Sequence, residues 1–293
     1  MKKYSKSVLK FKKLYIFLIS IFVVLFIVGI ILLVCFCFND RIEVDKQKND
    51  AMNVSDDVAV NSTPVIIDNL VIGATYNSRW VSANKYYLKS NNKNDCEIDV
   101  YNDDVKAGTY KIKEFLTDEN TVFVNTSYPN YIDEYFAIAK DSNYALVSQF
   151  GEAQIEERDY EYVKKALGLY RIYNTTMNIK NVYSGYIDTN TPVRILTITS
   201  NGKGMFGGIY SGIVLAFPNE NKASILQYSY TKDLENSDDF PLYSVEFLAD
   251  LNGDGKSEII TREVTEFNVT YNVFEYENDN CFKVLSETMK GNK

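Results

Sequence analysis

An uncharged, mostly apolar run near the amino terminus constrains this chain more than any other feature. Residues 14–38 read LYIFLISIFVVLFIVGIILLVCFCF and contain no charged side chain. As a helix this run would extend about 37 Å, which exceeds the roughly 30 Å hydrocarbon core of a bilayer. It therefore predicts a tilted transmembrane helix. The sequence that follows, NDRIEV, lacks the small-residue cleavage site of a secretory signal, so we expect an uncleaved signal-anchor.

The charges on either side of the run predict its orientation. Residues 1–13 form a basic tail with six lysines and no acidic residue, whereas acidic residues outnumber basic ones just after the run. Because positively charged flanks stay in the cytoplasm, the amino terminus is predicted to be cytoplasmic and the chain after residue 38 to be exported. The expected location is the cell membrane, with a single pass and an extracellular carboxyl-terminal domain. The lysines are Lys2, Lys3, Lys6, Lys10, Lys12 and Lys13.

Changes in composition divide the exported part of the chain. Residues 39–63 are polar and acidic without hydrophobic periodicity, which predicts a flexible stalk. From residue 64, short runs rich in Val, Ile, Tyr and Phe alternate with clusters of Asn, Asp, Gly and Ser, a pattern typical of strands joined by turns. We predict an N-terminal β subdomain at 64–150 and a C-terminal β subdomain at 171–288.

The segment between these subdomains, residues 151–170, has a helical period. Tyr160, Val163 and Leu167 follow one another at spacings of three and four, and Asp159 is a candidate cap. The predicted fold class is therefore mainly β (α+β): a transmembrane helix followed by an antiparallel β-rich ectodomain with one amphipathic helix. The strands could form a sheet, a sandwich or a partial propeller.

The residue composition limits the possible chemistry. The chain has no histidine, which excludes Ser-His-Asp and Cys-His catalysis and zinc sites with His ligands. Catalysis by paired carboxylates stays open, because 39 Asp and Glu are present. After the basic tail, 25 Lys and Arg stand against these acids, a net charge of −14, so we expect no nucleic-acid partner.

The strongest chemical signal is the stretch DLNGDGKSE at residues 250–258. Oxygen-bearing side chains at alternate positions of a tightly curled loop can point inward together, and Ca²⁺ prefers such a set of oxygen ligands. Gly253 and Gly255 permit the sharp turn. The candidate metal ligands are Asp250, Asn252, Asp254, the carbonyl of Lys256 and Glu258.

The longer stretch FLADLNGDGKSEII resembles the calcium loops of FG-GAP and VCBS-type repeats. In these repeats an acidic loop joins two strands, so the resemblance implies Ca²⁺ in a structural role. It covers about 15 residues in a single copy. A helical EF-hand is disfavoured, because the flanking residues favour strands and position 12 of the loop is Thr261. The fragment YIDTNTP, with Asp188 and Asn190, is either a decayed second copy or, by the simpler interpretation, a plain turn.

Three weaker features allow two interpretations each. Cys96 and Cys281 could form a disulfide, but two buried thiols are the simpler expectation. Trp80, near several tyrosines, could be a stacking platform for a sugar, whereas a single tryptophan in a β domain usually lies in the core. The glycine-rich stretch NGKGMFGG at 201–208 lacks the features of a phosphate-binding loop and is expected to be a hairpin or surface loop.

These features lead to a functional hypothesis without assigned catalytic residues. We expect a membrane-anchored extracytoplasmic module that serves in binding or as a structural attachment in the envelope of a Gram-positive-like bacterium and is stabilised by Ca²⁺. Its expected partners are the bilayer, through residues 14–38, and an unknown extracellular protein or carbohydrate. The alternative is an extracytoplasmic hydrolase that uses two carboxylates.

Overall fold

A computed structural model describes most of the chain after residue 61. The described residues are 62–89, 96–102, 105–118, 121–128, 135–140, 150–169, 177–202, 208–231, 240–277 and 280–290. The basic tail, the predicted transmembrane run and the stalk up to residue 61 lie outside this part. None of the helices in the described part has the length and hydropathy that crossing a bilayer requires.

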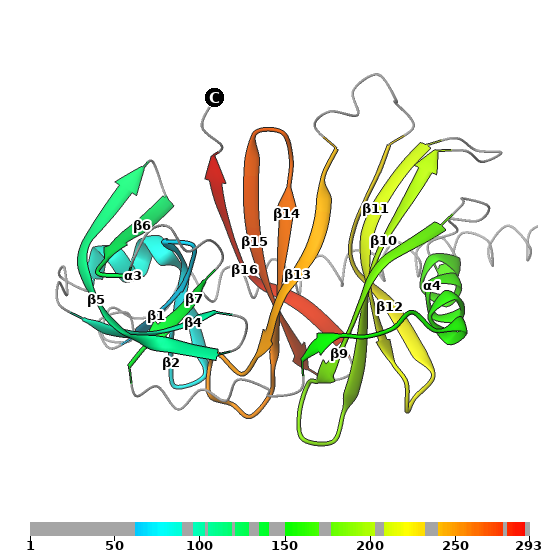
Figure 1. Ribbon diagram of the computed structural model, residues 1–293, viewed down its shortest axis with the longest axis horizontal. Helices are drawn as coiled ribbons and strands as arrows, with labels where there is room; N and C mark the ends of the chain where they lie inside the picture. Colours follow the sequence, from blue (N-terminus) through cyan, green and yellow to red (C-terminus); the bar gives the residue numbers. More distant parts are fainter. Residues whose placement is uncertain are drawn as a thin grey trace, which may run out of the picture. The chain divides into compact units, whose positions relative to one another are not determined.

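Three antiparallel sheets hold most of the regular structure in the described residues (Figure 1). The prediction of a mainly β fold with antiparallel strands is therefore confirmed. The sheets are called here the closed sheet (β1–β7), the outer sheet (β8–β12) and the middle sheet (β13–β16).

The closed sheet is formed by the first strands of the described part of the chain. Its strand order is β1-β7-β4-β5-β6-β2-β3, and β1 pairs again with β2, which closes the ring. Apolar side chains such as Ile66, Val71 and Val100 fill its interior. The strands are β1 (Thr63–Ile67), β2 (Leu70–Tyr76), β3 (Arg79–Val81), β4 (Glu97–Asn102), β5 (Val105–Asp118), β6 (Thr121–Thr126) and β7 (Phe136–Ala139).

Two-residue turns set the register of the first hairpins. Asp68 and Asn69 have φ values of 48° and 68°, and Asn77 and Ser78 have values of 48° and 59°. Positive φ at both central residues is the geometry of a type I′ turn, whose twist matches that of the paired strands, and Asn and Asp tolerate it better than most residues. The sequence therefore specifies these hairpins through its turn residues.

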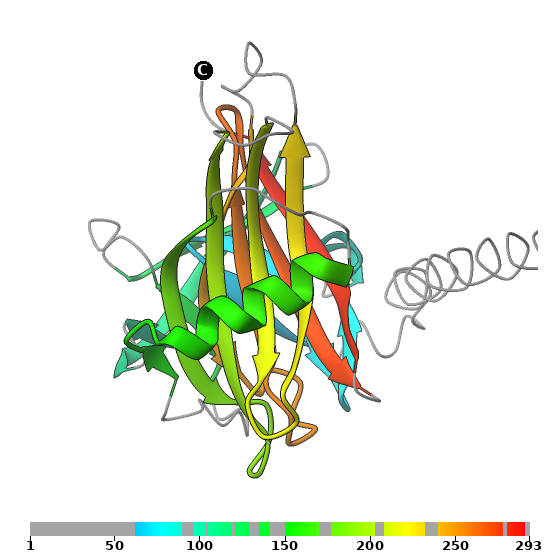
Figure 2. The same ribbon diagram turned by 90° about the vertical axis from the view of Figure 1, so that its right-hand side faces the viewer.

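The outer sheet has the order β12-β11-β10-β9-β8 and carries a helix on one face. Helix α4 (Glu157–Leu169) crosses the strands obliquely (Figure 2) and buries Val163, Ala166 and Leu167 against them. A helix is therefore present within the predicted range 151–170, but it begins only at Glu157, and Gly151–Glu152 form a strand instead. The strands are β8 (Gly151–Glu152), β9 (Met177–Tyr186), β10 (Pro192–Gly202), β11 (Gly208–Phe217) and β12 (Lys222–Thr231).

The middle sheet, in the order β13-β14-β15-β16, is covered on both faces. Ile260 and Val273 pack against the closed sheet, whereas Ile259 and Phe274 pack against the outer sheet. Burial on both faces explains why its strands contain adjacent apolar residues instead of a strict alternation. The strands are β13 (Leu242–Ala249), β14 (Glu258–Val264), β15 (Asn268–Glu277) and β16 (Asn280–Lys290).

The expectation of one helix in the ectodomain is wrong, because the described residues contain a second helix, α3 (Ala83–Lys89). The Oγ of Ser82 accepts the backbone N–H of Lys85 at 3.4 Å and so caps the helix. Ala83 and Tyr86, three positions apart, pack into the interior of the closed sheet. Seven residues are too few to show a helical period in the sequence.

A buried ion pair attaches α4 to the outer sheet. The guanidinium of Arg194 donates two hydrogen bonds of 2.7 Å to the carboxylate of Asp159, and a third of 2.9 Å to the backbone oxygen of Gln154. Asp159 is at position N3 of the helix and also accepts the backbone N–H of Glu156, the N-cap residue, at 2.7 Å. This is the hydrogen bond that the N3 side chain makes in a capping box. One carboxylate therefore caps the helix and fixes it to β10.

Replacing Asp159 by Ala should destabilise the protein strongly. The Arg194 side chain is only 7% exposed, so its charge would stay buried without its main partner, at a cost of about 3–5 kcal/mol. Urea unfolding of the variant measures this cost. The matched control is Glu161→Ala, which removes the exposed pair between Glu161 and Lys164 on the same helix and should cost less than about 0.5 kcal/mol. Equal destabilisation by both variants would contradict this role for Asp159.

Candidate metal loop and its contacts

The predicted metal loop connects two neighbouring strands of the middle sheet. β13 ends at Ala249 and β14 begins at Glu258, so residues 250–257 form the connection. Gly253 and Gly255 have φ values of 76° and 86°. These left-handed conformations are strained for residues with a Cβ, which is the physical reason for both glycines.

The loop curls around its own carboxylates. One carboxylate oxygen of Asp250 accepts the backbone N–H of Gly253 at 2.7 Å, and the other accepts that of Gly255 at 2.9 Å. The carboxylate of Glu258 accepts the N–H of Leu251 at 2.6 Å. Successive N–H groups that point at acidic side chains give the loop a fixed shape.

The predicted ligands divide into a buried and a peripheral group. Asp250, Asn252 and Glu258 are buried, with exposed fractions of 7%, 6% and 1%, respectively. Asp254 is exposed, and the backbone N–H of the half-buried Lys256 donates to its carboxylate at 2.8 Å. The structure therefore gathers three of the four predicted side-chain ligands in the buried part of the loop.

The buried acids carry an unfavourable concentration of negative charge. Burial raises the pKa of Glu258 well above its usual range, and the nearby charges of Glu275 and Asp250 raise it further. Burial also raises the pKa of Asp250, against the effect of its backbone hydrogen bonds. A bound cation would offset this repulsion and favour the charged carboxylates.

The oxygen atoms of the loop determine which metal ion it could bind. In the described part of the chain, no group of three or more acidic, cysteine or histidine side chains is close enough to hold a metal. A cation here would therefore need amide or backbone oxygens, such as those of Asn252 and Lys256, beside the carboxylates. An oxygen-only set of this kind fits a hard cation such as Ca²⁺ better than Zn²⁺ or copper.

The loop contacts the closed sheet through a shared glutamate that the sequence did not identify. The same Oε1 of Glu275, on β15, accepts the indole N–H of Trp80 at 2.8 Å and the side-chain amide of Asn252 at 2.9 Å. The hydroxyl of Thr75, on β2, also donates to the backbone oxygen of Leu251 at 3.3 Å.

The loop contacts the outer sheet as well. The backbone N–H of Ser257 donates to the backbone oxygen of Ile187, in the turn between β9 and β10. Residues 250–257 therefore form hydrogen bonds with all three sheets.

The neighbouring turn that contains Asp188 satisfies its own carboxylate. Asp188 accepts the backbone N–H groups of Asn190 at 2.8 Å and Thr191 at 2.9 Å, and the Thr191 hydroxyl at 3.0 Å. Burial alone would raise the pKa of Asp188, but these hydrogen bonds lower it. This geometry agrees with the interpretation of the fragment as a plain turn.

The structure shows where Trp80, the two cysteines Cys96 and Cys281, and part of the glycine-rich stretch 201–208 lie. Trp80 is 5% exposed and lies in the core between the closed and middle sheets, which confirms the simpler expectation. Cys96 and Cys281 are free thiols in different apolar clusters, and burial raises the pKa of Cys281 to about 12. The stretch 201–208 connects β10 to β11, and residues 203–207 lie outside the described part.

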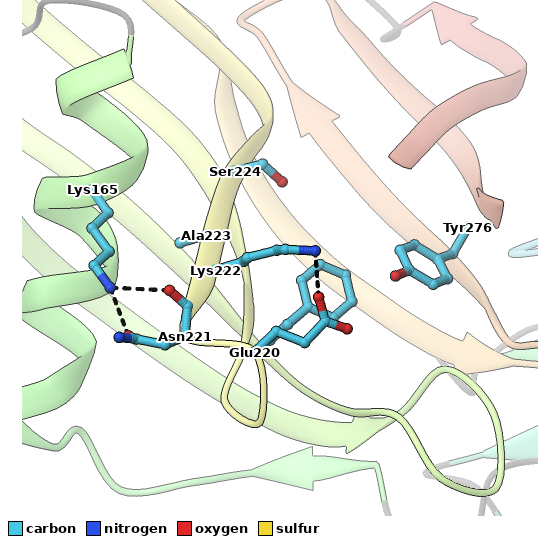
Figure 3. Close-up of a pocket in the computed structure, with 8 residues that line it drawn as sticks. Lys165, Glu220, Asn221, Lys222, Ala223, Ser224 and Tyr276 are labelled. Atoms are coloured by element: carbon cyan, nitrogen blue, oxygen red, sulfur yellow. Dashed lines mark hydrogen bonds and ion pairs between the residues drawn. The ribbon is translucent and has the colours of Figure 1, made fainter. Parts of the chain in front are cut away.

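A pocket of about 420 Å³ lies between α4, the β11–β12 turn and Tyr276 of β15 (Figure 3). Glu220 contributes the only carboxylate among its described lining residues and pairs with Lys222 at 2.6 Å. Lys165 donates to the side chain of Asn221 at 2.6 Å. This pocket therefore lacks the two facing carboxylates that the hydrolase hypothesis requires.

Comparisons of the chain with protein-family models, with curated proteins and with solved structures give no match.

Another acid, Glu287 on β16, lies where the middle sheet meets the closed sheet. It is opposite Tyr271 in the register and accepts the backbone N–H of Ala83. Burial raises the pKa of Glu287 to about 7, although this hydrogen bond acts in the other direction. The folded protein therefore binds this proton more tightly than the unfolded chain does. The resulting stabilisation is complete below about pH 4.5 and is lost as the pH rises through about 7.

Glu287→Gln should remove this pH dependence. Glutamine keeps an oxygen that can accept the Ala83 N–H but cannot ionise, so the variant and the wild type should have similar stabilities at pH 5. At pH 8 the variant should be more stable by about 2 kcal/mol. Urea unfolding at both pH values tests this expectation, with Glu277→Gln, at an exposed position of β15, as the control. A pH profile unchanged by Glu287→Gln would be inconsistent with this assignment.

Proposed function

We propose that this chain is a single-pass, membrane-anchored extracytoplasmic module that binds or supports another envelope component. Ca²⁺ bound by the loop at 250–258 stabilises its β-rich ectodomain. The observation that supports this proposal most directly is the set of hydrogen bonds from the loop to all three sheets. An ion at such a junction stabilises the whole ectodomain and not just one turn.

The proposed anchor and orientation rest on the sequence. Residues 14–38 are long and apolar enough to span a bilayer, and the basic tail before them favours a cytoplasmic amino terminus. The ectodomain then lies outside the cell, where free Ca²⁺ is available.

In this proposal the ligands are Asp250, Asn252, Asp254, Glu258 and the Lys256 carbonyl. Because the three carboxylates do not converge in the described structure, the exposed Asp254 would have to move inward to complete the site around the ion. When bound, Ca²⁺ supplies positive charge among carboxylates whose pKa is raised by burial. Its role is structural, because the chain offers no histidine and we assign no catalytic group beside the loop. With a dissociation constant near 10⁻⁴ M and about 1 mM free Ca²⁺, binding would add about 1.4 kcal/mol of stability.

Removing Ca²⁺ from the full-length protein in detergent should lower its melting temperature by about 3–6 °C. The variant Asp254→Ala should melt at the same temperature with and without chelator. Asp188→Asn, a change in the adjacent plain turn, should keep the full calcium response and is the matched control. Circular dichroism melts with EGTA or with 1 mM Ca²⁺ make the comparison. A wild-type melt that does not respond to chelator would refute the calcium site.

The fluorescence of Trp80 should report the state of the loop. Trp80 is the only tryptophan of the chain, and its indole shares Glu275 with Asn252 of the loop. Titration with Ca²⁺ should therefore shift its emission, with a midpoint near 10⁻⁴ M. Glu275→Gln should reduce the emission change, because the shared acceptor loses its charge. If Ca²⁺ raises the melting temperature without any change in emission, the coupling through Glu275 is wrong.

A further inference from the structure

Two exposed tyrosines stand on one side of β12. Tyr228 and Tyr230 are 44% and 39% exposed. Residues two positions apart in a strand point to the same face, with their Cα atoms about 7 Å apart. The two rings therefore form a pair on one surface.

The strand register places this pair beside α4. Ser200, Tyr210 and Tyr230 form one row across β10, β11 and β12, and Ile198, Gly212 and Tyr228 form the next. Ile198 and Tyr210 belong to the apolar cluster that also contains the buried residues of α4, so these rows lie on the helix-bearing face. The carboxyl-terminal half of β12 extends beyond α4 in Figure 2. We call these two rows the tyrosine face.

A glycine permits the close packing of the aromatic side chains on this face. The ring of Tyr210 stacks on that of Tyr228, with centroids 6.2 Å apart and planes inclined by 25°. A Cβ at Gly212 would lie 3.0 Å from the Tyr210 hydroxyl oxygen and 3.2 Å from the Tyr228 Cβ. Both contacts are too short for a side chain to fit without displacing its neighbours. The absence of a side chain at Gly212 therefore leaves the space that the stacked rings of Tyr210 and Tyr228 occupy.

A buried hydroxyl next to the pair has no hydrogen-bond partner. Ser200 is 6% exposed, lies beside Tyr210 in the first row, and its Oγ makes no hydrogen bond. Buried polar atoms are nearly always paired, so an ordered water is the expected partner of this hydroxyl beneath the tyrosine pair.

We propose that the tyrosine face binds a neutral polysaccharide. Exposed aromatic rings stack on the apolar faces of sugar rings, while the hydroxyls of Tyr228 and Tyr230 can exchange hydrogen bonds with sugar hydroxyls. The two rows contain no Asp, Glu, Lys or Arg, which favours an uncharged ligand over nucleic acid, a lipid headgroup or an acidic glycan. The inference rests on the proposed function, because such polysaccharides lie outside the cell.

Affinity electrophoresis of the full-length protein in detergent tests the proposal. The native gels contain hydroxyethyl cellulose, glucomannan, xylan or laminarin, and a gel without polysaccharide is the reference. At least one of these glycans should retard the wild type, and Tyr228→Ala/Tyr230→Ala should weaken the retardation by about tenfold or more. The double Phe variant should keep most of it, because the rings remain. Phe267→Ala, at an equally exposed aromatic in the β14–β15 turn, is the matched control and should bind like the wild type.

Two results would overturn the proposal: no retardation by any of the four glycans, or equal retardation of the wild type and the double Ala variant. A third outcome is that no glycan retards the protein, but the wild type forms a dimer that the double Ala variant does not form. This result would assign the tyrosine face to self-association instead. The calcium hypothesis is tested separately by the chelator melts. If the melting temperature does not change with chelator but the protein still binds glycan, the metal site is refuted and the polysaccharide inference still holds.

Discussion

The carboxylate of Glu275 joins the closed sheet, the middle sheet and the loop of residues 250–257. It accepts hydrogen bonds from Trp80 of the closed sheet and from Asn252 of the loop, and so connects two layers with the candidate metal site. Burial raises the pKa of this carboxyl, and the charge of Asp254 adds to the effect. The fold thus keeps an acid in an unfavourable environment at the junction of its sheets, where a cation in the adjacent loop would favour the charged carboxylate.

The arrangement of the sheets explains why that junction matters. The middle sheet packs through Ile260 and Val273 on one side and through Ile259 and Phe274 on the other, so its strands are the common core of the three sheets. The loop of residues 250–257 leaves the edge of this core between β13 and β14. From there it reaches Thr75 in the closed sheet and Ile187 in the outer sheet.

Local features of the sequence predicted local structure well. The period of Val163 and Leu167 predicted α4, and the glycines and acids of residues 250–258 predicted a tight turn rich in oxygen donors between strands. Helix α3 was missed because it is short and is stabilised by burial of Tyr86 in the closed sheet, which a sequence pattern does not reveal. Glu275 was missed for a related reason: its partner Trp80 is 195 positions away, and only the tertiary fold brings the two together.

Hydrogen exchange of the full-length protein, followed by mass spectrometry with and without Ca²⁺, tests most directly whether the loop joins the sheets. If the loop joins the sheets, Ca²⁺ slows exchange in residues 250–258 and, at the same Ca²⁺ concentrations, in β3 and in the β9–β10 turn. Protection confined to the loop, with unchanged exchange around Trp80 and Ile187, would show that the loop does not join them.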